Sequence, residues 1–340
     1  MASLKIRDLG TKWPAILLFG AGPWIILGII AAVCPAVPSE PVLKAGYFHQ
    51  RPLVDTVVIG DSRVLGISEE PFVRRGWAYF NMGMSGLSPE DILLQLEYAL
   101  AHGKIRRVIM GMSFESMTES YPFEFSRYRD EPPFRALSLS AYDLPEQVFT
   151  FHLKGMRDIF RPPLWASMRL KRLVRPEVAV FLPNGNGSYL AIERSIHAGT
   201  YDFHVNRDPK TYFLRDDGEE RYLNTRVLSP HALKLYAQIF ARLRARGIPC
   251  LVFETGRRPE YQAMIDEQPV LSRLQGEWRG FLRTQSFGGI RALSFQEMAA
   301  DYDLDDFFDS CHFIGPTEGR VGEHLAAALA GLERISFKQR

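Results

Sequence analysis

The sequence predicts an α/β fold, a three-layer sandwich around a central and mostly parallel sheet, preceded by one N-terminal transmembrane helix. Short continuous apolar runs alternate with amphipathic stretches, and their spacing suits strand–helix–strand units with helices on both faces of a sheet. A charge-free apolar run near the N-terminus predicts the membrane helix. With 46% hydrophobic and 24% charged residues among 340, the chain can fill a core, which excludes disorder over most of its length.

Charge and cysteine content exclude further classes of protein. Lys and Arg number 41 and Asp and Glu 39, so the net charge of +2 provides no global field that would favour nucleic acid as a partner. The three cysteines (Cys34, Cys250 and Cys311) are too few for a disulfide framework, and their spacing fits no zinc site. We also expect neither a metal ion nor an organic cofactor, because the histidines lack metal-ligand spacing and no G-x-G-x-x-G motif follows the first predicted strand.

The N-terminal part of the chain contains a run from residue 13 to residue 39 without any charged side chain. It holds about 20 apolar residues in succession, enough for a helix to cross the hydrocarbon core of a bilayer. Basic residues precede the run (Lys5, Arg7 and Lys12), and the positive-inside rule places them in the cytoplasm. The predicted divisions are a cytoplasmic N-terminus, a transmembrane anchor and a linker: residues 1–12, 13–35 and 36–52.

Three other interpretations of this run stay open. A cleaved signal peptide would have a shorter apolar stretch and would end in a small-residue cleavage site, which the sequence lacks. Residues 31–34 loosely resemble a lipoprotein site, although Val33 stands where a small residue is needed. A buried core helix is seldom so long and free of charge. An uncleaved anchor predicts a single-pass membrane protein whose remaining chain lies outside the cytoplasm.

The rest of the chain, residues 53–335, predicts one domain with an insertion at about 116–228. Apolar runs that suit buried parallel strands lie at residues 55–59, 78–81, 105–110, 248–253 and 290–295. Amphipathic stretches that suit helices lie at residues 89–102, 229–246 and 317–332. Ser88 and Ser229 can cap the first two helices, because a proline follows each of them at the first helical position. The less regular insertion contains helix candidates at 144–161 and 164–174 and a turn at 184–188.

Three short motifs carry the candidate chemistry: Gly60-Asp61-Ser62, residues 81–86 and residues 309–312. In a parallel sheet, ligands bind beyond the carboxyl ends of the strands. Ser62 would expose a hydroxyl there, and the glycines of residues 81–86 would let a backbone N–H approach a reacting oxygen. Asp309 and His312 are three residues apart, so the carboxylate can orient the imidazole as a base. Taken singly, these motifs also fit a capped turn, a loop with positive φ and an acidic turn with an isolated histidine.

Together and in this order, the three motifs resemble the conserved blocks of the SGNH (GDSL-type) hydrolase superfamily. The resemblance covers about residues 53–115 and 229–332 and implies a flavodoxin-like sandwich. It also implies Ser62 as the nucleophile, His312 as the general base and Asp309 as its orienting partner. The backbone amides of Ser62 and Gly86 would then be oxyanion donors.

The third block of that superfamily is altered in this chain. The family usually has Gly-x-Asn-Asp after the third strand, and Ser113 stands at the position of the asparagine. A serine hydroxyl can donate a hydrogen bond but is shorter than an amide, and losing one oxyanion donor costs roughly 3–4 kcal/mol in the transition state. Either Ser113 substitutes for the asparagine, or the site relies on the other two donors, or activity is low.

This departure and the predicted anchor are similar to the envelope polysaccharide acyltransferase-like branch of the superfamily. The resemblance implies a protein of the bacterial inner (cytoplasmic) membrane whose catalytic domain, residues 53–335, is periplasmic or extracellular. Its substrates would be an acyl donor and a secreted or cell-wall polysaccharide, with O-acetyl or O-acyl transfer through a Ser62 acyl-enzyme. A multispanning membrane O-acyltransferase is the implied partner. Two alternatives remain: a carbohydrate esterase, and a catalytically weak polymer-binding or scaffold subunit of an envelope export complex.

Arginines near the same sheet edge are candidate substrate-binding residues. Arg257 and Arg258 follow the predicted strand 248–253 and could bind an anionic or sugar ligand, or could be ordinary loop charges. Arg63 beside the nucleophile could reduce the cost of charge in the transition state, or could face solvent. We expect no calcium site among the acidic residues 301–306, because the glycine and glutamate of an EF-hand loop are missing.

Overall fold

The computed structural model describes residues 39–119 except 52, residues 225–294, most of 297–338 and short pieces between 126 and 201. These residues belong to one compact unit, Ser39–Pro145 with Ala179–Arg340. The predicted cytoplasmic segment and anchor lie outside the described residues, as do nearly all of the two helix candidates in the insertion. Among the helices that the structure describes, none combines the length and the apolar character needed to cross a membrane.

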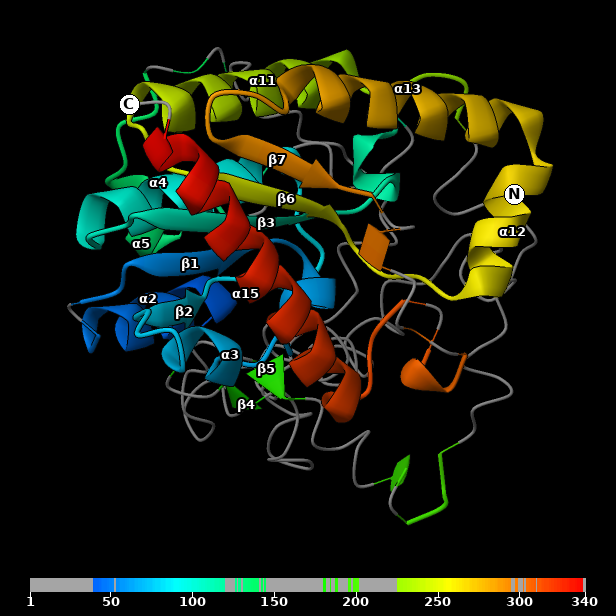
Figure 1. Ribbon diagram of the computed structural model, residues 1–340, viewed down its shortest axis with the longest axis horizontal. Helices are drawn as coiled ribbons and strands as arrows, with labels where there is room; N and C mark the ends of the chain where they lie inside the picture. Colours follow the sequence, from blue (N-terminus) through cyan, green and yellow to red (C-terminus); the bar gives the residue numbers. More distant parts are fainter. Residues whose placement is uncertain are drawn as a thin grey trace, which may run out of the picture. The chain divides into compact units, whose positions relative to one another are not determined.

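The centre of the described domain is a five-stranded sheet in which every strand is parallel to its neighbours, in the order β2-β1-β3-β6-β7. Figure 1 shows the sheet between helices. The strands are β1 (Thr56–Ile59), β2 (Tyr79–Asn81), β3 (Arg107–Met112), β6 (Cys250–Glu254) and β7 (Ile290–Leu293). Each lies within or overlaps one of the predicted apolar runs. The predicted α/β class with a parallel central sheet is therefore confirmed.

Both faces of the sheet are buried, which explains why the strands read as continuous apolar runs. Val57 and Ile59 of β1 belong to one hydrophobic cluster, whereas Val58 between them belongs to a second cluster. Leu251 of β6 alternates with Cys250 and Val252 in the same way. Successive side chains of a strand point to opposite faces, so a sheet covered on both faces needs apolar residues at every position.

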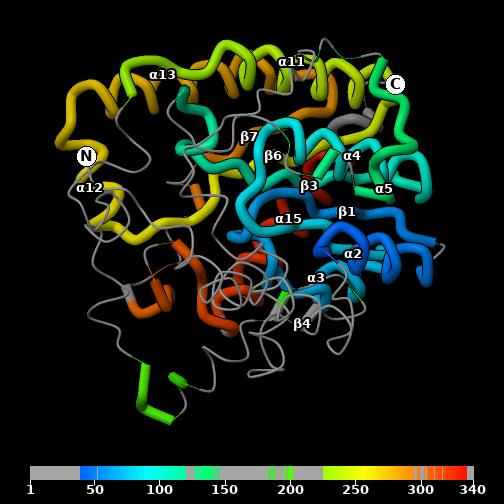
Figure 2. The backbone as a smooth tube through the Cα atoms, turned by 180° about the vertical axis from the view of Figure 1, so that it is seen from behind, coloured from blue at the N-terminus to red at the C-terminus, as the bar shows by residue number. Residues whose placement is uncertain are grey.

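Helices form the outer two layers. One face is covered by α2 (Glu40–His49), α4 (Pro89–His102), α11 (Pro230–Ala245) and α13 (Pro269–Gln285). The other face is covered by α3 (Glu70–Val73) and α15 (Gly315–Lys338). Helix α15 crosses in front of the sheet in Figure 1 and lies behind it in Figure 2. The described part of the chain is thus an α/β sandwich of three layers.

Side-chain caps fix where two predicted helices begin. Ser88 and Asp91 form a capping box at the start of α4: Ser88 Oγ accepts the N–H of Asp91 at 3.1 Å, and Asp91 Oδ2 accepts the N–H of Ser88 at 3.0 Å. Ser229 Oγ accepts the N–H of Ala232 at 3.2 Å at the start of α11. The sequence therefore predicts the first residue of both helices.

The predicted linker 36–52 contains an unexpected helix, α2. Its buried residues Pro41, Lys44, Ala45 and Phe48 recur at helical spacing and pack against the same core as α4. Burial lowers the pKa of the Lys44 amine from 10.5 to about 7, an effect only partly offset by the charge of Glu40. This part of the predicted linker is therefore an ordered part of the domain. The reason is that one apolar stripe of a short helix closes the core.

Described pieces of the insertion include the two-stranded sheet β4 (Val180–Phe181) and β5 (Gly187–Ser188), close to the predicted turn. The N–H of Gly187 donates to Leu65 O at 2.9 Å, and the N–H of Asn81 donates to Asn184 O at 2.9 Å. These bonds place residues of the insertion against the segment that follows β1 and against the last residue of β2.

Candidate active site

The site lies at the carboxyl edge of the sheet, where β1, β2 and β3 end side by side. Gly60, directly after β1, has a φ of +152°. A Cβ there would lie 2.9 Å from Gly111 O of the neighbouring strand and 2.9 Å from Val64. Only glycine therefore suits this close approach of two strands at the start of the site.

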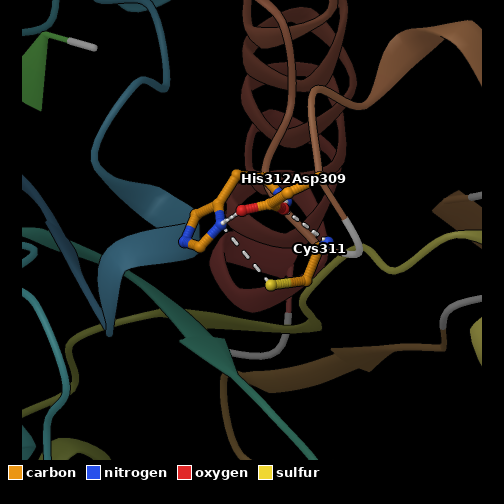
Figure 3. A group of neighbouring side chains, drawn as sticks. All are labelled: Asp309, Cys311 and His312. Carbon is orange, nitrogen blue, oxygen red and sulfur yellow. Dashed lines mark hydrogen bonds and ion pairs between the residues drawn. The ribbon is translucent and has the colours of Figure 1, made fainter. Parts of the chain in front are cut away.

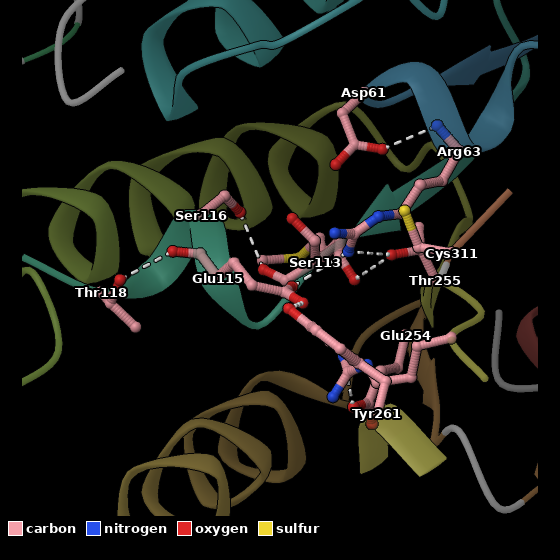
Figure 4. Close-up of polar contacts among 12 residues, drawn as sticks. Asp61, Arg63, Ser113, Glu115, Ser116, Thr118, Glu254, Thr255, Tyr261 and Cys311 are labelled. Carbon is pink, nitrogen blue, oxygen red and sulfur yellow. Dashed lines mark hydrogen bonds and ion pairs between the residues drawn. The ribbon is translucent and has the colours of Figure 1, made fainter. Parts of the chain in front are cut away.

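Ser62 follows as the first residue of the short 3₁₀-helix η2 (Ser62–Val64). The preceding Asp61 caps this helix, since its carboxylate accepts the N–H of Arg63 at 3.0 Å. The cap turns the Asp61 carboxylate toward the backbone, as Figure 4 shows, and leaves the Ser62 hydroxyl to face another part of the chain.

That other part is the loop before α15, which brings His312 and Asp309 to Ser62. His312 Nε2 lies 2.8 Å from Ser62 Oγ, and His312 Nδ1 lies 2.7 Å from Asp309 Oδ2. In the tautomer in which Nδ1 donates to Asp309, Nε2 accepts the hydroxyl proton of Ser62. The side chains of His312 and Asp309 are 12% and 20% exposed, so the pair is shielded but reachable. The structure brings together these three sequence-predicted residues.

The loop that carries the histidine is fixed on both sides. Phe307 and Phe313 form an antiparallel bridge and are buried, and the N–H of Phe308 donates to His312 O at 3.1 Å. The ring of Phe308 stacks on the imidazole with 5.5 Å between centroids. The imidazole is therefore held by an aromatic face, a contact that the motif alone does not reveal.

Asp309 uses both carboxylate oxygens. Oδ2 bonds the imidazole, and Oδ1 accepts the N–H groups of Cys311 and His312, each at 2.8 Å. Burial by itself would raise the pKa of Asp309, but the charge and hydrogen bond of His312 and the two backbone N–H groups lower it on balance. Asp309 is therefore ionised near neutral pH, which stabilises a protonated His312.

Asp309, Cys311 and His312 also form a cluster of potential metal ligands, drawn in Figure 3, with one ligand atom of each within 4.8 Å of the others. Cys311 Sγ lies 3.5 Å from His312 Nδ1. An ion held there would take the Nδ1 lone pair and would replace the Asp309–His312 hydrogen bond. The 2.7 Å separation of Nδ1 and Oδ2 is typical of a charge-assisted hydrogen bond, so the residues fit an oriented histidine better than a metal centre.

The loop after β2, residues 81–86, is tied to the Ser62 turn. Asn81 Nδ2 donates to Val64 O at 2.7 Å, and the N–H of Met84 donates to Gly60 O at 3.1 Å. Gly86 has a φ of +60°, a conformation that favours glycine. The candidate oxyanion donor Gly86 therefore lies on a loop whose first half is fixed relative to the Ser62 turn.

Ser113, the third candidate oxyanion donor, directly follows β3 and is 3% exposed. Its carbonyl oxygen accepts the hydroxyl of Ser116 at 2.8 Å, which folds the chain into the turn that carries Glu115. Figure 4 shows Ser113 beside Arg63 and Glu115. It lies at the strand end where the resemblance of the motifs predicts a third oxyanion donor.

The Arg63 side chain neither faces solvent nor is available to bind substrate, because its guanidinium is buried in an ion pair with Glu115. Arg63 Nη1 donates to Glu115 Oε2 at 3.0 Å and to Thr255 Oγ1 at 3.3 Å, and the hydroxyl of Tyr261 donates to Glu115 Oε1 at 2.7 Å (Figure 4). Burial by itself would raise the pKa of Glu115, but Arg63 and Arg257 together with the hydrogen bond from Tyr261 lower it to about 2. The pair joins the turn after β1 to the turn after β3.

The two other candidate arginines also have protein partners. Arg257 is 0% exposed, and its Nη2 lies 3.1 Å from Glu254 Oε1 while its Nη1 donates to Gln262 at 3.0 Å. Arg258 is 8% exposed and pairs with Glu260 at 3.0 Å. The substrate contact expected for Arg257 does not fit its complete burial. Its carboxylate partner comes three residues earlier, at the end of β6, and a strand-end glutamate gives no sign in sequence of being buried.

Two cavities in the described domain are lined by residues other than Ser62, Asp309 and His312. One, of about 370 Å³, lies past β6 and β7 and is lined in part by Glu254, Arg279 and Ser294. The other, of about 400 Å³, is lined in part by Phe134 and Tyr142.

Comparisons with known proteins add little to this geometry. No protein-family model and no curated protein matches the chain. A solved structure from Streptococcus pneumonia, provisionally named a platelet activating factor, is 9% identical with a TM-score of 0.40, and the match covers 85% of this chain and 92% of that chain. A similarity of this size carries no argument, so the interpretation of the site depends on its own geometry.

Replacing Glu115 by glutamine removes the carboxylate that neutralises buried Arg63. We expect the free energy of unfolding at pH 7 to fall by about 3–5 kcal/mol, because breaking a buried pair leaves an uncompensated charge in an apolar environment. Urea denaturation measures the change. The control is Glu119→Gln, at an exposed position four residues later, which should change the unfolding free energy little.

The pH dependence of the same variant checks the electrostatic origin of the effect. The folded-state pKa of about 2 lies below the ordinary 4.5, so the stability contributed by Glu115 is complete above pH 4.5 and is lost as the pH falls toward 2. The stability difference between wild type and Glu115→Gln should shrink over that window. Equal stabilities at pH 7 would contradict the assigned role.

Proposed function

We propose that the protein is an SGNH-type serine acyl-transfer enzyme in which Ser62 carries the acyl group. The observation that supports this most directly is the continuous contact from Ser62 Oγ through His312 to Asp309, with distances of 2.8 and 2.7 Å. Nucleophile, base and orienting carboxylate within hydrogen-bond reach are the arrangement that activates a serine for acyl transfer.

In the first step, Ser62 Oγ attacks the carbonyl carbon of an acyl donor while His312 Nε2 takes the hydroxyl proton. The N–H groups of Ser62 and Gly86, with Ser113 as the third donor, stabilise the negative oxygen of the tetrahedral intermediate. The intermediate then expels the donor's leaving group, which takes the proton from His312, and Ser62 remains acylated.

In the second step, a hydroxyl group of the acceptor gives its proton to His312 Nε2 and attacks the acyl-enzyme. Collapse of the second intermediate releases Ser62, which recovers the proton from His312. Asp309 holds the imidazole in one tautomer throughout and stabilises the imidazolium of each step. If water takes the place of the acceptor hydroxyl, the same residues hydrolyse the acyl-enzyme, which is the esterase alternative.

The acceptor in this proposal is a secreted or cell-wall polysaccharide, bound by the insertion at 116–228. The bonds from Gly187 to Leu65 and from Asn81 to Asn184 support the insertion's closeness to Ser62, since both join it to the segments around the nucleophile. The strand order β2-β1-β3-β6-β7 supports the flavodoxin-like assignment. An anchor at residues 13–35 would hold the catalytic domain outside the inner membrane, next to a multispanning O-acyltransferase that supplies the acyl group.

An active-site serine probe tests the nucleophile. A fluorophosphonate should label full-length wild type and should fail to label Ser62→Ala, because the probe reacts only with an activated serine hydroxyl. The control Ser68→Ala replaces another partly exposed serine six residues away and should keep the labelling. A folded wild type that resists the probe would favour the scaffold alternative.

Replacing Asp309 by asparagine tests whether this carboxylate orients His312 as the general base. An asparagine keeps a carbonyl oxygen for the two backbone N–H groups, so the fold should persist, but it favours the wrong tautomer of His312. We expect kcat for a chromogenic aryl acetate to fall by about 10⁴-fold. Asp305→Asn, at an exposed position on the same loop, serves as the control. Full activity of Asp309→Asn would reject Asp309 as the orienting partner.

Product analysis separates the transferase from the esterase. With an acyl donor and an oligosaccharide present together, a transferase yields acylated oligosaccharide, whereas an esterase yields the free acid alone. Acid release that does not change when the oligosaccharide is added would support the esterase.

A further inference from the structure

Two side chains of α2, one helical turn apart, bind the loop that carries Gly86. Glu40 Oε2 accepts the N–H of Ser85 at 2.8 Å, and Glu40 Oε1 accepts its hydroxyl at 3.1 Å. Lys44 Nζ donates to Asn81 O at 2.9 Å. Residues four apart lie on the same side of a helix, so α2 presents both groups to one loop. The two contacts fall at the beginning and near the end of residues 81–86.

The rest of the loop shows why these contacts matter for Gly86. Asn81 and Met84 tie the first half of the loop to the nucleophile turn through bonds to Val64 O and Gly60 O. Ser85 comes after these bonds and is exposed. Glu40 therefore holds the residue directly before Gly86, together with the hydroxyl of Tyr128, which donates to Ser85 O at 3.5 Å.

The direction of the Gly86 N–H depends on Ser85, the residue before it. That N–H belongs to the peptide unit whose carbonyl is Ser85 O, and peptide units are planar, so the two groups turn together. Glycine at a φ of +60° has little steric preference of its own to fix the unit. Contacts at Ser85 supply the constraint: Glu40 holds the N–H and hydroxyl of this residue, and Tyr128 bonds its carbonyl oxygen.

Lys44 holds the other end of the loop through a buried hydrogen bond. Its side chain is 0% exposed, and burying an amine is unfavourable unless it is hydrogen-bonded. Asn81 O provides that bond, and the amide of the same residue bonds Val64 O. A displacement of α2 would therefore reach Asn81 and, through it, the turn that carries Ser62.

We propose that Glu40 and Lys44 are positioning residues for acyl transfer, which aim the Gly86 N–H at the oxyanion by holding residues 81–86 from α2. The proposal rests on the proposed function, because it assigns the Gly86 N–H to a developing oxyanion. Glu40 bonds Ser85 and Lys44 bonds Asn81, so both act on the transition state through the loop.

Kinetics of Glu40→Ala in the full-length protein test the proposal. We expect kcat for an aryl acetate to fall by about 10- to 100-fold, less than the roughly 10²–10³-fold cost of removing an oxyanion donor outright. The KM should stay within about twofold, because ground-state binding does not use the oxyanion contact. Glu40→Gln keeps one oxygen that can accept from Ser85 and should recover part of the loss.

The matched control is Glu70→Ala, which removes the exposed first-turn glutamate of α3 and should leave kcat unchanged. Lys44→Met removes the bond to Asn81 while keeping the apolar stem, and we expect a similar loss of kcat. If Lys44→Met does not fold, the kinetics of Glu40→Ala still test the proposal. Glu40 is only partly buried, so its replacement should leave the fold intact. Equal kcat in wild type and Glu40→Ala would overturn the proposal.

Hydrogen exchange provides a readout that needs no activity. Amides of residues 85 and 86 should exchange faster in Glu40→Ala than in wild type, whereas those of α4 should not change. Unchanged exchange at residues 85 and 86 would contradict the proposal that Glu40 holds this loop, whatever the activity of the variant. A wild type that is not labelled at Ser62 contradicts the proposed function instead, so the two failures are distinguishable.

Discussion

The site depends on the hydrogen bond between Ser62 Oγ and His312 Nε2, which joins two residues 250 positions apart in the chain. The parallel sheet makes the contact, because parallel strands end at one edge and the chain returns to that edge after β7. The buried Phe307–Phe313 bridge and the two N–H groups on Asp309 then fix the imidazole. A loop without these supports would leave the serine beside a mobile base.

Buried charges connect the turns around this bond. Arg63, next to Ser62, pairs with Glu115 on the turn after β3, and Arg257 pairs with Glu254 at the end of β6. Such pairs seldom add net stability compared with apolar packing, because their desolvation offsets their attraction. Their effect here is geometric: the Arg63–Glu115 pair couples the turns after the neighbouring strands β1 and β3, and the Arg257–Glu254 pair holds the turn after β6. Small displacements of these turns would move the proposed oxyanion donors relative to Ser62. Helix α2 does the same for the loop after β2.

Much of the fold could be predicted, because its signals are local. Ser88 before Pro89 marks the first residue of α4, and the runs around Val58 and Leu251 mark strands that are buried on both faces. The proximity of Ser62 and His312 was also predicted, from the resemblance of the three motifs to the SGNH superfamily, since residues 309–312 do not directly follow a strand. The prediction of a linker at 36–52 was incomplete, because α2 is short and is stabilised by its packing against the core rather than by its own sequence.

Burial of the arginines could not be predicted for a related reason. A charged residue after a strand reads as solvent-exposed unless its partner is known, and Arg63 is bound by residues 52 and 192 positions later. Pairings over such distances are a property of the folded chain. The same holds for the stacking of Phe308 on His312, where the two residues are close in sequence but their ring geometry is set by the bridge.

A crystal structure of the protein after reaction with a phosphonate serine inhibitor tests the central claim most directly. The account predicts a covalent bond from phosphorus to Ser62 Oγ, with one phosphoryl oxygen about 2.7–3.1 Å from the backbone nitrogens of Ser62 and Gly86. An adduct on a different side chain, or a phosphoryl oxygen turned away from both amides, would contradict it.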